Sequence, residues 1–287
     1  MISIFSKPAF LNVNSGQPYT KGSYKGRGHM MRVSSIIRAD QIAERIGAKL
    51  NPDSGYENDV CIYVKPHLKK GDMDFNFEGR KSYIDIVDGH NLGQLAKNYP
   101  KVGVIVCSEA DKKVMASTIK NEIVVIPQQH CNYEEITRDR TGVKTVGIIG
   151  TEKSFVHIPE EIDTGFKARG IEFIKFSKFF EREDIIKFYQ SIDIQLVWRP
   201  YRKVLSNPLK IVNASSFGIP TIALYEPAFE EVEECYIPVN HLEELFHKFD
   251  ILRTDNVLYD NIGQDCLIKS DKYHIEAIGK LYKALDD

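Results

Sequence analysis

Short runs of β-branched and aliphatic residues alternate with helical periodicity along most of the chain. Between the strands, apolar residues recur at helical spacing, and we expect helices at 31–47, 109–117, 183–191, 209–217 and 241–249. This alternation predicts an α/β protein with parallel sheets covered by helices on both faces. The expected strands are 2–5, 60–64, 83–87, 102–107, 122–126, 145–149, 172–176, 192–198, 220–224 and 234–238.

The strand–helix pattern occurs twice, which predicts two domains. At 287 residues the chain is long for one core and comfortable for two. The polar segment 136–143 fits neither the strand nor the helix periodicity, so we place the domain boundary there. The predicted domains are 1–138 and 139–270, followed by a C-terminal helix within 271–287.

Composition is that of a soluble globular protein, with 43% hydrophobic and 27% charged residues. No apolar run approaches the roughly 20 residues that span a bilayer, and the N-terminus lacks a signal-peptide pattern. Five cysteines are scattered and never in C-x-x-C spacing. We therefore predict a reduced, cytoplasmic protein, or one in the host cytoplasm if the source is viral.

Charge is unevenly distributed although the net charge is only −2. No acidic residue precedes Asp40, and such a segment is typical of a phosphate-facing surface or of a solvated basic face. The basic residues before Asp40 are Lys7, Lys21, Lys25, Arg27, Arg32 and Arg38.

One stretch points to a particular chemistry. Residues 206–232, SNPLKIVNASSFGIPTIALYEPAFEEV, predict an amphipathic helix that turns sharply into a buried strand and then an acidic loop. The stretch resembles the donor-sugar signature of GT-B glycosyltransferases: a Lys-containing helix, then EAMACGVPVVA, then a loop over the sugar. The matching positions are Lys210, Asn213, Ala214, Gly218, Pro220, Ala223 and Glu231.

The resemblance, to a short and divergent member of the glycogen-synthase and sucrose-synthase superfamily, implies an architecture and a reaction. Two Rossmann-like domains would face each other across a cleft, and the last helix would pack back on the first domain. The second domain would bind a nucleotide-diphosphate sugar, and the first would bind an acceptor glycan or small molecule. The implied enzyme is a metal-independent hexosyl- or pentosyltransferase with no cofactor beyond its donor.

Cations mark the predicted donor site. Ser206 and Pro208 are typical of a helix start, and Lys210 then lies in a first turn that has no carboxylate, which suggests a bound anion. Arg199 and Arg202 end the preceding strand, at the edge where such sheets bind ligands. The resemblance implies that Lys210 with one of these arginines grips the diphosphate; the alternative is a surface lysine on an amphipathic helix.

Further donor contacts follow from the resemblance. Asn213 takes the place of the second Glu of an E-x7-E motif, which this chain lacks at both ends, and an amide can still bond ribose hydroxyls. Glu226 or Glu230 would hold sugar hydroxyls, or would be surface charges. Gly150 and Thr151 would approach the phosphates.

Two glycines before the first long helix also suit a phosphate. Gly26, Arg27 and Gly28 lie in a loop where backbone could approach the donor diphosphate closely. The spacing is not G-x-G-x-x-G, so a dinucleotide fingerprint is not supported.

Asp88 and His90 follow the strand 83–87, at its carboxyl end. Either side chain could deprotonate an acceptor hydroxyl. The alternative is that Asp88 caps a turn with Gly89.

Three alternatives stay open at this point. The Asp72-Met73-Asp74 match to a metal-binding D-x-D motif lies in a polar loop, so we expect no metal site.

The basic N-terminal segment also fits a bacteriophage-type glycosyltransferase acting on a hydroxymethylated DNA base. A nucleotide-sugar epimerase and a non-catalytic sugar-phosphate binder are the rivals outside transferases.

Overall fold

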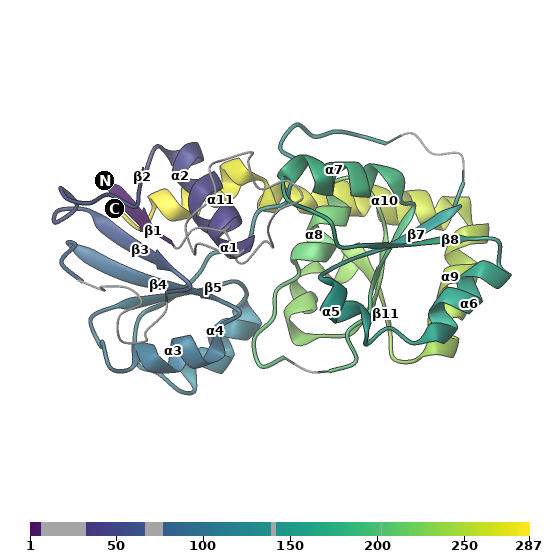
Figure 1. Cartoon of the computed structure of the whole chain (residues 1–287), viewed down its shortest axis with the longest axis horizontal. Coiled ribbons are helices and arrows are strands. Elements are labelled where there is room, and N and C mark those ends of the chain that lie inside the picture. The colour runs from purple at the N-terminus through teal and green to yellow at the C-terminus, as the bar shows by residue number, and fades with distance from the viewer. Residues whose placement is uncertain (7–32, 67–76, 139–141, 202) are drawn as a thin grey trace, which may run out of the picture. The chain divides into compact units, whose positions relative to one another are not determined.

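The computed structural model describes residues 1–6, 33–66, 77–138, 142–201 and 203–287. The chain forms two compact units, each built on its own parallel sheet (Figure 1). Unit 1 comprises Met1–Gln128, Val204–Asn207 and Ile275–Asp287. Unit 2 comprises Gln129–Lys203 and Pro208–His274.

Unit 1 is a doubly wound α/β unit with strand order β2-β1-β3-β4-β5-β6, in which all neighbours run parallel. Helices α2 and α11 lie on one side of this sheet, and α3 and α4 lie on the other (Figure 1). The strands are β1 (Ile2–Phe5), β2 (Lys49–Leu50), β3 (Val60–Val64), β4 (Lys81–Val87), β5 (Gly103–Val106) and β6 (Ile123–Val125). The helices are α1 (Val33–Ser35), the π-helical η1 (Ile36–Asp40), α2 (Gln41–Ile46), α3 (His90–Ala96), α4 (Glu109–Ala116) and α11 (Ile275–Lys283).

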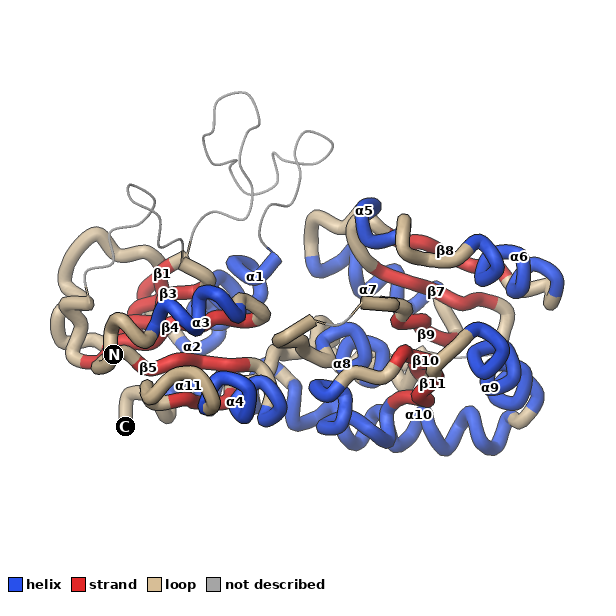
Figure 2. The backbone as a smooth tube through the Cα atoms, turned by 90° about the horizontal axis from the view of Figure 1, so that it is seen from below, coloured by secondary structure: helices blue, strands red, loops and turns tan. Residues whose placement is uncertain are grey.

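Unit 2 has the strand order β11-β10-β9-β7-β8, again all parallel. One apolar cluster joins the sheet to α6 and α9, and another joins it to α7 and α8; Figure 2 shows α8 and α9 on opposite sides of β9 and β10. The strands are β7 (Thr145–Ile149), β8 (Glu172–Phe176), β9 (Ile194–Val197), β10 (Thr221–Leu224) and β11 (Tyr236–Val239). The helices are α5 (Glu152–Phe155), α6 (Glu160–Ala168), α7 (Arg182–Ser191), α8 (Leu209–Ser215), the 3-10 helix η2 (Pro227–Cys235), α9 (Leu242–Thr254), α10 (Asn256–Ser270) and the 3-10 turn η3 (Asp271–Tyr273).

The predicted α/β class is confirmed, and each expected strand is present. The structure also contains β2, an edge strand of two residues, and the helical segments α3, α5, α6, η2 and α10, none of which was expected from the sequence. The compact units divide after Gln128, ten residues before the boundary expected from the sequence. The physical reason is that the intervening segment is bonded into unit 2: the Asn132 side-chain amide donates to the Ser216 carbonyl at 2.7 Å.

A buried ion pair fastens the C-terminal helix to unit 1. Arg38 Nε donates to Asp85 Oδ2 at 2.7 Å, and both side chains are fully buried. The Tyr282 hydroxyl of α11 donates to the same oxygen at 3.0 Å. Burial disfavours the Arg38 charge, but Asp85 more than offsets this and raises the pKa of Arg38 above its ordinary value. One carboxylate therefore links η1, β4 and α11.

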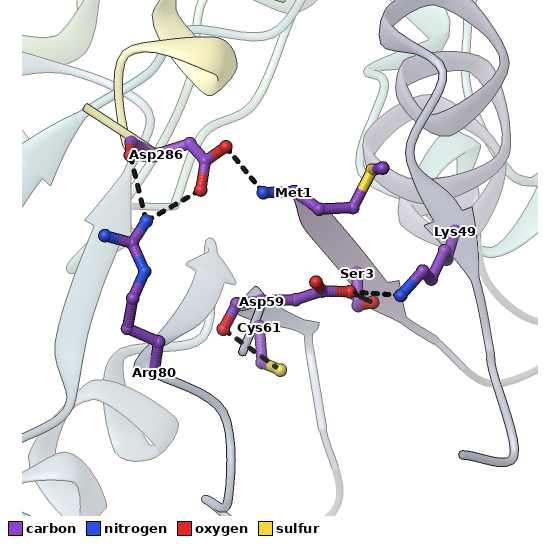
Figure 3. A network of polar contacts seen from close by, with 7 residues as sticks. All are labelled: Met1, Ser3, Lys49, Asp59, Cys61, Arg80 and Asp286. Carbon is purple, nitrogen blue, oxygen red and sulfur yellow. Dashed lines mark hydrogen bonds and ion pairs between the residues drawn. The ribbon is translucent and has the colours of Figure 1, made fainter. Parts of the chain in front are cut away.

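A second polar network ties the amino ends of the unit 1 strands together (Figure 3). Asp59, just before β3, accepts hydrogen bonds from Ser3 of β1 at 2.7 Å and from Lys49 of β2 at 2.8 Å. Burial opposes ionisation of Asp59, yet these two partners outweigh it and lower the pKa of the carboxyl. Asp286 likewise joins the Met1 amine to Arg80, at 2.7 Å each. The bond from Lys49 to Asp59 ties the two-residue strand β2 to the start of β3.

We expect Asp85→Asn to destabilise unit 1 by about 3–5 kcal/mol, because it leaves the Arg38 guanidinium buried without a counter-charge. Tyr282→Phe removes one hydrogen bond and keeps the ion pair, so it should cost about 1 kcal/mol. Urea unfolding of the full-length variants measures both. A loss below about 1 kcal/mol for Asp85→Asn would show that the ion pair does not hold the unit together.

Candidate functional site

The strand order of unit 2 favours one position at the edge of its sheet as a ligand site. From β7 the chain moves outward to β8, then returns past β7 to β9 and continues to β10 and β11. The order therefore reverses between β7 and β9, and open α/β sheets bind ligands beyond the carboxyl ends of strands at such a point. Gly150 follows β7 and Arg199 follows β9, so both lie at this edge.

Lys210 is surrounded by positive charge at that edge. Burial and the charges of Arg199 and Lys203 lower the pKa of its ammonium to about 8, and Glu226 only partly opposes them. A lysine whose charged form is disfavoured by like charges gains most from a bound anion. The arrangement of Lys210, Arg199 and Lys203 therefore suits a phosphate group.

Arg199 and Glu226 are paired with each other. Arg199 Nε donates to Glu226 Oε1 at 2.8 Å, and its Nη2 contacts the other carboxylate oxygen. This fork is the strong, bidentate form of the interaction, and Glu226 is buried. Arg199 is the predicted diphosphate ligand and Glu226 is a predicted sugar ligand. In this structure the two side chains bind each other, and their ion pair links the ends of β9 and β10.

Gly150 packs closely against Ser154 and lies near the Lys210 ammonium. A Cβ at Gly150 would lie 2.5 Å from Ser154 Oγ and 3.7 Å from Lys210 Nζ. The backbone of Gly150 is fixed, because its N–H donates to the Phe176 carbonyl at 3.0 Å. Thr151 follows, and its carbonyl accepts from Ser154 Oγ at 2.6 Å. The structure thus places Gly150 next to Lys210.

Two predicted donor residues form hydrogen bonds within the protein. Asn213 Oδ1 accepts the Cys131 N–H at 2.8 Å in the interior of unit 2, so a ribose contact through this oxygen would break that bond. Ser206 does not cap α8: Pro208 is the residue before the helix, and no side chain caps it. The Ser206 N–H instead donates to Asp111 Oδ1 at 3.1 Å, and Ser206 belongs to unit 1.

The remaining donor candidates divide into two groups. Glu230 is exposed in the first turn of η2 and accepts a hydrogen bond from Tyr225 at 2.5 Å. Gly26, Arg27, Gly28 and Arg202 lie outside the described residues, as do Asp72 and Asp74 of the D-x-D match.

In unit 1, Asp88 lies on a sharp turn between β4 and α3. Gly89 N–H donates to the Ile86 carbonyl at 2.7 Å, and Val87 has a φ of +54°. A β-branched residue rarely adopts this conformation, and such strain is concentrated at functional sites. Asp88 Oδ1 contacts Lys65 Nζ at 2.6 Å, and Lys65 itself has a φ of +41° at the end of β3.

His90 begins α3 and is half-buried, two residues beyond Asp88. Asp88 does not cap α3, because Gly89 occupies the cap position without a side-chain bond. The strained turn therefore presents Asp88, with Lys65 beside it, at the carboxyl end of β4.

Neither a metal-binding cluster nor a membrane-spanning helix is present among the described residues. No group of three or more His, Cys, Asp and Glu side chains among them is placed to hold a metal ion. No helix within the described ranges is both long and apolar enough to cross a membrane.

Known proteins resemble this chain in structure. No family model and no curated protein matches its sequence. Anabaena HepE, crystallised with UDP and glucose, matches with a TM-score of 0.58 at 12% identity, over 99% of this chain and 98% of that one. T4 phage β-glucosyltransferase matches with a TM-score of 0.55 at 12% identity, over 100% of this chain and 99% of that one. Both are GT-B proteins.

The chain has the GT-B fold. TarM shares it, with a TM-score of 0.57 at 14% identity over 80% of this chain. The match covers 55% of TarM, so this chain spans about half the length of that protein. Identities this low establish the fold, and the reaction has to be argued from the residues.

Sequence reasoning missed two charged residues at these strand ends. Lys65 is the partner of Asp88, and Lys203 is a neighbour of Lys210. Lys65 directly follows a predicted buried strand, which was a usable signal. Nothing in the local sequence indicates that Lys203 faces Lys210.

Proposed function

We propose that the chain is a glycosyltransferase that moves a sugar from a nucleoside-diphosphate sugar to an acceptor hydroxyl. The observation that carries the proposal is the gathering of Lys210, Arg199 and Lys203 at the point where the strand order of unit 2 reverses. Of the groups that act on the Lys210 ammonium, Arg199 and Lys203 disfavour its charged form and the Glu226 carboxylate favours it, so this ammonium would gain from added negative charge. A diphosphate would supply it.

Stabilising the negative charge of the leaving diphosphate is what this reaction needs most. As the bond between the sugar C1 and the diphosphate oxygen breaks, its electron pair passes to the diphosphate. Cations held in place beforehand stabilise that developing charge without reorganising. Lys210 and Arg199 would do this from α8 and the end of β9. Support also comes from the shared fold of HepE, which is crystallised with UDP and glucose.

Asp88 is the proposed base in unit 1. The acceptor hydroxyl oxygen would bond to the sugar C1, and its proton would pass to the Asp88 carboxylate. Lys65 would fix the orientation of that carboxylate through the 2.6 Å contact. The strained turn at Val87 is what supports this assignment over a structural one.

The acceptor is the second substrate of the proposed reaction. A glycan or small molecule is the acceptor that we propose first. A hydroxymethylated DNA base is the second candidate; a phage glycosyltransferase, the T4 β-glucosyltransferase, matches over 100% of this chain and 99% of that one. The basic residues that favour DNA lie mostly in 7–32, outside the described residues.

Incubating the full chain with a panel of UDP-, GDP-, ADP- and dTDP-sugars tests the proposal. We expect slow release of the nucleoside diphosphate from one nucleotide class, because water can replace a missing acceptor. Adding glycans, small alcohols or hydroxymethylated duplex DNA should accelerate release with the true acceptor. No nucleotide binding and no release from any donor would contradict the proposal.

Lys210→Ala should weaken binding of that nucleoside diphosphate by roughly 10- to 150-fold, the range for a charge-assisted hydrogen bond. Isothermal titration calorimetry measures the change. Lys167→Ala is the matched control, because Lys167 is exposed near the end of α6, which leads into the amino end of β8. Equal affinities of the two variants would remove Lys210 from the site.

Asp88→Asn should lower turnover by about 10²- to 10⁴-fold while leaving nucleotide affinity unchanged, since a general base acts on the acceptor proton. Steady-state kinetics and calorimetry on the same preparation separate the two quantities. If Asp88→Asn keeps its activity and His90→Ala loses it, the base is His90. Full activity in both variants would make this turn structural.

A further inference from the structure

Gln195 is a polar residue inside an apolar strand. It is the second residue of β9, in the sequence Ile-Gln-Leu-Val, and it is fully buried. Its neighbours in the sheet are Gly147 of β7 and Thr221 of β10. Burying an amide costs free energy unless its groups are hydrogen-bonded, so the bonds that it makes indicate why it is there.

The Gln195 side chain reaches the helix that carries Lys210. Its Nε2 donates to the Lys210 carbonyl at 2.8 Å and to Thr221 Oγ1 at 3.3 Å. The Tyr189 hydroxyl of α7 donates to the same Lys210 carbonyl at 3.3 Å. Within the described part of the chain, Gln195 Oε1 has no hydrogen-bond partner. An apolar side chain would avoid that cost, so core packing alone does not account for a glutamine here.

The bond to Lys210 has a mechanical consequence. Gln195 lies on β9, and Arg199 lies just past the end of the same strand. Arg199 and Lys203 disfavour the charge on Lys210, and Glu226 offsets this only in part, so a first turn of α8 that moved away from these cations would relieve the repulsion. A hydrogen bond from β9 to the first turn resists that movement.

We infer that Gln195 is a positioning residue that holds Lys210 beside Arg199 and Lys203 against the repulsion that these two cations exert on it. The cation cluster is then preorganised for an anion before the anion arrives. The identity of the anion as a donor diphosphate rests on the proposed function. The hydrogen bond from Gln195 Nε2 to the Lys210 carbonyl, called the tether below, is independent of that function.

The titration of Lys210 reports on the tether. The groups that act on its ammonium are Arg199, Lys203 and Glu226, and burial adds to the two cations. If the first turn of α8 relaxes, Lys210 moves away from like charges and toward water, and both changes favour its charged form. Loss of the tether therefore moves the titration midpoint to higher pH.

Competitive acetylation with trace reagent, read at Lys210 by mass spectrometry over pH 6–11, measures this midpoint in the full chain. We expect a wild-type midpoint near pH 8. Gln195→Met has a similar length and no donor, and it should raise the midpoint by about half a pH unit or more. Its nucleoside-diphosphate affinity should fall about 2- to 12-fold, as for one neutral hydrogen bond.

Two further variants make the result specific. Gln195→Asn keeps an amide that is too short to reach Lys210, and it should reproduce the upward shift even if Gln195→Met folds poorly. Thr221→Val removes the other partner of Gln195 in the same layer of the sheet, and it should leave the midpoint unchanged. A wild-type midpoint in both Gln195 variants would overturn the inference. A shifted midpoint in a protein that binds no nucleotide would support the tether and contradict the proposed function.

Discussion

Parallel strands covered on both faces decide where this protein can place polar groups. A side chain in the middle of such a strand is buried against helices, so a charge there is costly unless it is paired, as Asp85 of β4 is with Arg38. The charged residues of the candidate site lie instead where strands end. Because every strand of a sheet points the same way, the carboxyl ends share one edge. The reversal of strand order between β7 and β9 then separates two loops at that edge. Gly150, Arg199 and, through α8, Lys210 all depend on this constraint.

Electrostatics at that edge of unit 2 is unbalanced in a way that core packing does not require. Glu226 neutralises Arg199 through a bidentate pair, while Lys210 stays crowded by cations and its pKa is lowered to about 8. In unit 1 the corresponding charges, Lys65 and Asp88, neutralise each other. The two units therefore differ in the chemistry that they offer.

Much of the fold followed from the sequence, because strand and helix periods are local signals. The alternation of short apolar runs with helical periodicity predicted β7, β9 and β10. It therefore also predicted the sheet edge that holds the candidate site. The long helix α10 was missed because it packs on both α8 and η2, so its apolar residues do not form one stripe. The two-residue strand β2 is paired through the Lys49–Asp59 contact, which no local pattern reveals.

Side-chain pairing was the part that sequence could not supply. Asn213 matched a ligand-binding position of the resembling family, yet it bonds Cys131, 82 residues away in the chain. Arg199 and Glu226 were each assigned to a ligand, and 27 residues separate them although they form one ion pair. Long-range contacts of this kind depend on how the strands are ordered in the sheet. Only the folded unit shows them.

The central claim is that the carboxyl edge of β7 and β9 binds a nucleoside diphosphate. A crystal structure of the full chain, grown with whichever nucleoside diphosphate binds it in solution, tests this claim most directly. The account predicts diphosphate oxygens within hydrogen-bonding distance of Lys210 Nζ and next to the Gly150 backbone. A diphosphate bound elsewhere in either unit, with Lys210 making no contact to it, would contradict the account.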